Sequence, residues 1–173
     1  MWRESGLLPF IGTVALITGM AATTACPAQE PSSPPRIASG ILKDGRLVVA
    51  IGDRVTVHLG EDLRPVVDAV IPAPENSDDP GQHSSRPGGP ITFTLKANPS
   101  GGTILLVHSA YSKPLRYHAR IGIVREGKSM SAPTSTCPVL TGLMVFESWP
   151  EPIVAIIVTS FEENANGDTA CHN

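Results

Sequence analysis

Short apolar runs separated by turn-forming residues recur along the chain from residue 37 to residue 161. Residues 46–51 and 54–59 are rich in β-branched side chains and flank a Gly-Asp pair. Glycine supplies the positive φ that a tight hairpin turn requires, so these two runs predict a hairpin. In residues 115–123, apolar side chains alternate with two arginines and a histidine. That alternation predicts a strand with one buried and one solvated face.

The other apolar runs are equally short and bounded by turn residues. They predict a short strand at 37–43, an edge strand at 64–71 that begins near Pro65, and strands at 91–95, 103–109, 139–147 and 153–161. The last of these is the most apolar and is expected to be a central strand. Residues 125–138 are polar and are expected to separate two strands. Residues 72–90 carry no aliphatic side chain larger than alanine or proline, which indicates a long exposed loop.

Seven or eight short strands predict an all-β domain over residues 36–173. We expect an immunoglobulin-like β-sandwich, with an open β-barrel as the alternative. Seventeen prolines and sixteen glycines fit such a turn-rich domain. The net charge is −3 and only 5% of residues are aromatic, so no basic surface interleaved with aromatic side chains is expected. Nucleic acid is therefore not an expected partner.

The N-terminal region has the character of an export signal. Residues 7–22 are uncharged and apolar but are interrupted by a proline and two glycines, and they are short for a bilayer helix, which needs about 20 apolar residues. We therefore expect a signal peptide at 1–25, followed by a Pro/Ser-rich tether at 26–35. The stretch Met-Ala-Ala-Thr-Thr-Ala that leads into Cys26 resembles a bacterial lipoprotein signal.

The resemblance to lipoprotein signals implies that the thiol of Cys26 carries a lipid and that Cys26 is the first residue of the mature protein. The expected location is then the cell envelope, periplasmic or anchored at the outer membrane, with the membrane as one partner. The alternative is an ordinary secretory signal and a soluble secreted protein, which leaves Cys26 as an odd thiol. Odd cysteines are uncommon in exported proteins, and this favours lipidation.

The two other cysteines, Cys137 and Cys171, are expected to form a disulfide, as exported proteins commonly do. Such a bond would hold the C-terminal tail against the body of the domain. The alternatives are two free thiols or zinc ligation together with His172. The latter lacks the two pairs of closely spaced ligands that mark a structural zinc site.

Candidate chemistry is sparse, and no cofactor is expected. His58, His108 and His118 all fall in predicted strands, and His108 and His118 are the weak candidates for a metal site. Residues 162–168 alternate acidic and amide side chains before a glycine but lack the leading aspartate and closing glutamate of a calcium loop. Asp78, Asp79 and His83 share the 72–90 loop, a poor place to hold acid–base geometry.

The segment around Trp149 is the most unusual feature of the domain. Trp149 lies between Glu147 and Glu151 and is followed by proline, so these three residues are a candidate partner contact on a rigid loop. The alternative is that Trp149 folds back onto the core.

From these features we expect an exported envelope protein whose sandwich is a non-enzymatic binding or accessory module for another envelope protein. One alternative is a metal-binding protein or enzyme that uses His108, His118 and the 72–90 loop. The other is a purely structural lipoprotein. Metal content and the effect of Trp149→Ala on partner capture separate these three hypotheses.

Overall fold

The computed structural model describes residues 37–73 and 88–172. The predicted signal peptide, the 26–35 tether with Cys26, and most of the 72–90 loop lie outside the described residues. Within the described ranges the chain forms strands and no helix. No helix capable of spanning a membrane is found in this part of the chain.

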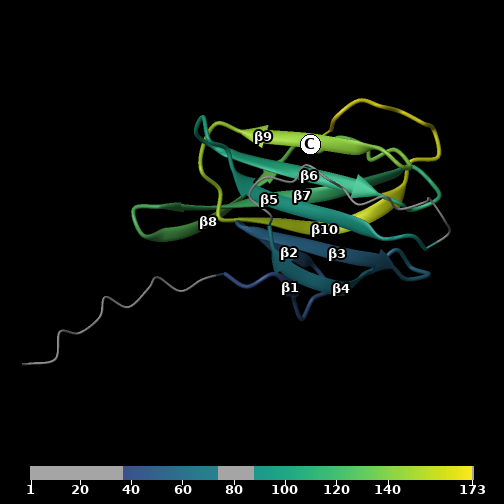
Figure 1. The fold of residues 1–173 in the computed structure, drawn as a ribbon, viewed down its shortest axis with the longest axis horizontal. Helices are drawn as coiled ribbons and strands as arrows, with labels where there is room; N and C mark the ends of the chain where they lie inside the picture. The colour runs from purple at the N-terminus through teal and green to yellow at the C-terminus, as the bar shows by residue number, and fades with distance from the viewer. Residues whose placement is uncertain (1–36, 74–87, 173) are drawn as a thin grey trace, which may run out of the picture. The chain divides into compact units, whose positions relative to one another are not determined.

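Ten strands are formed by the described residues (Figure 1). In chain order they are β1 (Gly40–Ile41), β2 (Leu47–Ala50), β3 (Asp53–Leu59), β4 (Pro65–Pro72), β5 (Ile91–Ala97), β6 (Thr103–Ser109), β7 (Leu115–Arg125), β8 (Lys128–Thr134), β9 (Met144–Trp149) and β10 (Ala155–Glu163). Their number exceeds the seven or eight expected for the sandwich, because each of the nine runs predicted above contains a strand and β8 forms where a polar break was expected.

The strands form two five-stranded antiparallel sheets that pack face to face. Sheet A has the order β1-β2-β10-β7-β8, and sheet B has the order β4-β3-β5-β6-β9. The predicted all-β sandwich is confirmed, and the sheets do not close into a barrel. Strands β8 and β9 are edge strands on the same side of the sandwich, since residues 135–143 join them directly.

The core lies between the sheets and follows the alternation seen in the sequence. Apolar side chains of β7 and β3 point inward while their neighbours face out, as predicted for residues 115–123. The rings of Phe93, Tyr117 and Phe161 pack at the centre, with centroids 5.7 to 6.3 Å apart. The central position of β10, between β2 and β7, is also confirmed.

The predicted hairpin of residues 46–51 and 54–59 is wrong. Strand β2 pairs with β1 and β10 in sheet A, whereas β3 pairs with β4 and β5 in sheet B. The Ile51 N–H donates to the carbonyl of Val154, and the Gly52 N–H donates to the carbonyl of Leu95. Gly52, with φ of 84°, therefore turns the chain from one sheet to the other rather than back along the same sheet.

Two other boundaries differ from the sequence prediction. Residues 128–134, expected as part of a polar break, form β8 by pairing along the outer edge of β7. The strand expected at 139–147 begins only at Met144 and continues to Trp149. The shift makes Trp149 the last residue of a strand rather than part of a loop.

Candidate functional site

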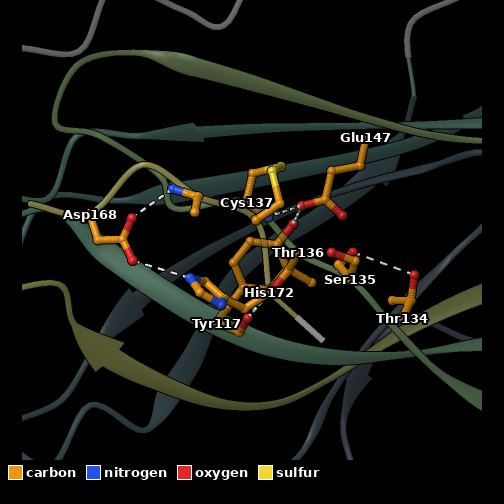
Figure 2. Close-up of a disulfide and its surroundings, with 10 residues drawn as sticks. Tyr117, Thr134, Ser135, Thr136, Cys137, Glu147, Asp168 and His172 are labelled. Atoms are coloured by element: carbon orange, nitrogen blue, oxygen red, sulfur yellow. Dashed lines mark hydrogen bonds and ion pairs between the residues drawn. A yellow bond between two sulfur atoms is a disulfide. The ribbon is translucent and has the colours of Figure 1, made fainter.

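The C-terminal tail is fastened to the segment that follows β8 by a disulfide and a short backbone pairing. The predicted bond between Cys137 and Cys171 is present, with a sequence separation of 34 residues (Figure 2). Beside it, the Thr136 N–H donates to the His172 carbonyl at 2.8 Å, and the His172 N–H donates back at 3.0 Å. We call this disulfide together with the Thr136–His172 pairing the clasp.

Side chains around Asp168 reinforce the clasp. The Asp168 carboxylate contacts the Arg116 guanidinium at 2.6 Å and the His172 ring at 3.1 Å, and it accepts the Ala170 N–H at 2.9 Å. These donors, the Ala170 N–H first, lower the pKa of Asp168 to about 2. Asn164 donates to the Asp168 carbonyl at 2.6 Å. Residues 162–168, the segment compared above with a calcium loop, are therefore held by an internal hydrogen bond from Asn164 to Asp168. The Asp168 carboxylate is also in contact with the Arg116 guanidinium.

A buried carboxyl group lies directly beneath the clasp. Glu147 on β9 accepts two hydrogen bonds at its Oε1 atom, from the Tyr117 hydroxyl at 2.5 Å and from the Cys137 N–H at 3.0 Å (Figure 2). Since Tyr117 is on β7, the first bond joins sheet B to sheet A through the interior. The second bond fixes the backbone of Cys137. One carboxyl thus ties together both sheets and the disulfide.

The protonation of this pair is set by its surroundings. Burial raises the pKa of Glu147, and the bonds from Tyr117 and the Cys137 N–H only partly oppose that effect. Burial, followed by the nearby Glu147 carboxyl, raises the pKa of Tyr117 well above its usual value. The Oε2 atom of Glu147 is buried and has no hydrogen-bond partner among the residues the structure describes. Burial thus makes the charged form of Glu147 less favourable than that of a carboxyl group in water.

A polar surface pocket of about 300 Å³ adjoins the clasp. Its lining residues are Arg116, Glu162, Glu163, Asn164, Ala165, Asn166 and Asp168. Arg116 pairs with Asp168 inside it, and Lys113 contacts Glu163 at 2.6 Å from its rim. Two of the three carboxylates that line the pocket are therefore already paired with a lysine or arginine side chain.

The candidate histidines do not converge. His108 lies on the outer face of sheet B, because its neighbour Val107 points into the core, and His118 lies on the outer face of sheet A, between the inward-facing Tyr117 and Ala119. His58 contacts Asp68 at 2.7 Å on sheet B. Within residues 37–73 and 88–172, no three His, Cys, Asp or Glu side chains are grouped closely enough to hold a metal ion.

The three residues of the predicted partner contact have different environments. Trp149 packs partly against the core, and its Nε1–H donates to Thr134 Oγ1 at 2.9 Å. Glu147 is only 7% exposed and points inward, so it is not part of a surface with the other two. Glu151 lies at the surface, where it pairs with Arg125 at 2.6 Å. A contact through Trp149 and Glu151 stays a prediction.

Phe146 is an exposed aromatic residue that the sequence analysis passed over. Its side chain is 60% exposed on the outer face of β9. The signal was present in the alternation of Val145, Glu147 and Trp149, which share the inner face and leave Phe146 on the outer one. The same alternation could have located the buried Glu147.

Comparison of the chain with protein families, with curated proteins and with solved structures finds no match. Its function is therefore inferred from its own residues. Those that bear on function are the clasp, the buried Glu147 and the exposed side chains at the end and along the edge of β9.

Proposed function

We propose that the chain is an exported protein of the bacterial cell envelope, anchored by a lipid on Cys26, whose β-sandwich binds another envelope protein without catalysis. The observation that carries the proposal is the Cys137–Cys171 disulfide. Disulfides persist in oxidising compartments outside the cytoplasm and are rare inside it. The export signal predicted at 1–25 and the small residues before Cys26 agree with that location.

The proposed contact with the partner is the corner at residues 148–152, where β9 ends. Trp149 is held there by core packing and by its bond to Thr134, and the residue is only partly buried. An aromatic side chain that is ordered before binding loses little conformational entropy on association. The neighbouring Glu151–Arg125 pair supplies a charged rim to this corner. This combination is typical of a small protein contact.

The intact mass of the protein from membranes of its native host tests export and anchoring. We expect a chain that begins at Cys26, carries a lipid-sized increment and gains two hydrogens on reduction. A chain that begins elsewhere and carries no lipid would refute the anchor. A mass unchanged by reduction would refute the disulfide and with it the main support for export.

Site-specific photocrosslinking in intact cells tests the binding corner. A crosslinking residue in place of the exposed Pro150 should give a discrete adduct with an envelope protein. The matched control is Glu61, which is exposed in a turn at the opposite end of the sandwich. Equal adducts from both positions, or none from either, would contradict a binding corner and favour a purely structural lipoprotein. If the adduct at position 150 forms equally well in the Trp149→Ala variant, Trp149 is not part of the contact.

A further inference from the structure

Each sheet of the sandwich has two edge strands, and three of the four edges carry features that hinder pairing with another strand. Strand β1 is two residues long and lies against β4. Strand β4 has proline at both ends and a bulge at Asp68. Strand β8 contains Lys128 and Pro133, and proline lacks the N–H that a ladder needs.

The fourth edge, β9, has none of these features. Its sequence, Met-Val-Phe-Glu-Ser-Trp, has no proline or lysine, and its register with β6 is unbroken from Met144 to Trp149. Every second residue of an antiparallel edge strand directs its backbone N–H and C=O away from its neighbour. Glu147 is the only charged residue of β9, and its carboxyl is already buried and bonded to Tyr117. It therefore presents no charge to a strand added outside.

We propose that β9 pairs with β9 of a second copy of this chain, antiparallel and about a two-fold axis, so that the two copies of sheet B become one continuous sheet. An antiparallel pairing of identical strands is self-complementary, as a two-fold interface requires. The register places Phe146 opposite Phe146 of the second copy. The paired edge shares Ser148 and Trp149 with the proposed binding corner, and the self-association proposed here goes beyond the function proposed above.

The chemistry of the opposed side chains supports a second copy as the occupant. With Phe146 on the axis, Met144 opposes Ser148 on the outer face and Val145 opposes Glu147 on the inner face. No like charges lie opposite each other. The Phe146 side chain, which is 60% exposed in the single copy, would pair with Phe146 of the second copy. Cross-strand aromatic pairs stabilise a sheet, whereas like charges directly opposite destabilise it.

A ladder of six residues forms a small interface, so self-association in solution is expected to be weak. If both copies carry the proposed lipid, confinement to one membrane raises their effective concentration and favours the dimer. Only this enhancement rests on the proposed function. Self-association in solution can be measured without the lipid, so a failure of the anchor and a failure of the dimer are distinguishable.

Sedimentation velocity over a range of concentrations tests the pairing on the mature chain with Cys26→Ser, which removes both the lipid and the odd thiol. We expect a reversible dimer. Phe146→Lys and Phe146→Asp should each weaken self-association by roughly tenfold or more, since each places like charges opposite on the axis. Mixing the two variants should restore a dimer through opposite charges. Met130→Lys, at a similarly exposed apolar position on the β8 edge, should change nothing.

Three results would overturn the proposal. If the wild-type chain stays monomeric at all concentrations, β9 does not pair with a second copy, and the strand of a different protein becomes the candidate occupant of this edge. A Phe146→Lys variant that dimerises like the wild type locates the interface elsewhere. A mixture of the Lys and Asp variants that remains monomeric refutes the register. Thermal unfolding of each variant checks that a lost dimer is not a lost fold.

Discussion

Removal of the Cys137–Cys171 disulfide should destabilise the domain mainly through its effect on the unfolded chain. The bond closes a loop with a sequence separation of 34 residues. The chain-entropy relation for a loop of that length gives about 3.8 kcal/mol at 25 °C. That value is an upper bound, because a reduced tail is held mainly by partly exposed ion pairs and can detach without global unfolding. We therefore expect a loss of about 2–4 kcal/mol.

Urea unfolding measures this loss in the variant Cys137→Ser/Cys171→Ser, with Cys26→Ser in both variant and parent so that no odd thiol can exchange. With a slope of about 2 kcal/mol/M for a domain of this size, the midpoint should fall by roughly 1–2 M. Adding a thiol-free reductant to the parent should reproduce most of that fall, because Cys171 is exposed to solvent. The variant itself should not respond to the reductant.

A fall equivalent to less than about 1 kcal/mol would refute the reasoning, since it lies below the range expected for this loop. An unchanged unfolding slope is also required. A markedly smaller slope in the variant would mean that part of the domain is already unfolded before the transition, so that the bond maintains native structure instead of restricting the unfolded chain.

Three further predictions concern the surroundings of the clasp and the end of β9. Burial raises the folded-state pKa of Glu147 above its usual 4.5, so its stabilising contribution is full below that pH and is lost as pH rises through the raised pKa. Glu147→Gln, which remains neutral, should flatten this decline in urea midpoints measured from about pH 4 to about pH 8. The pKa of Asp168 is lowered to about 2, so its contribution is present above 3.8 and lost as pH falls toward 2. Asp168→Asn should make the midpoint less dependent on pH in that acid range, and an unaltered dependence would show that the bonds to Asp168 do not form in solution. Gly102 has φ of 82°, and a Cβ atom there would lie 2.1 Å from the Trp149 carbonyl oxygen. Gly102→Ala should therefore cost about 2–5 kcal/mol in urea unfolding, and a loss below about 1 kcal/mol would contradict this close approach.

The strands that the sequence predicted well are those whose pattern alone decides their structure. In β7 the apolar and charged side chains alternate over residues 115–123, and one such face must be buried wherever the strand lies. In β10 a nine-residue strand begins with four apolar residues, which indicated a central position between other strands. Both predictions depended on local pattern and needed no knowledge of the partner strands.

Pairing between strands was harder to predict, because alternation reveals which side chains are buried but not which sheet buries them. Strands β2 and β3 both direct apolar side chains into the same core, but from opposite sheets. A glycine between two strands fits either a hairpin turn within one sheet or a crossing from one sheet to the other. Strand β8 was missed for a related reason. Its residues have little apolar character of their own, and its position is fixed by pairing with β7 and by the bonds from Arg120 to Ser131.

The clasp was predicted as a disulfide, but the groups that support it were not. The contact between Glu147 and Tyr117 joins residues 30 positions apart, and no local spacing indicates it. An acidic residue beside a tryptophan and prolines resembles an exposed loop, which is how Glu147 was interpreted. Its place on the inner face follows only once β9 is extended to Trp149.

Strand β9 links the clasp to both proposed contacts. Its inner face carries Glu147, whose carboxyl accepts the Cys137 N–H, and its outer face carries the exposed Phe146. Because the disulfide fixes Cys137, it also restricts β9 through this hydrogen bond, and Trp149 restricts the end of the strand through Thr134. An edge strand ordered in advance loses less entropy when another strand pairs with it. The disulfide therefore bears on binding at β9 through the order that it gives to that edge, although neither sulfur lies at a proposed contact.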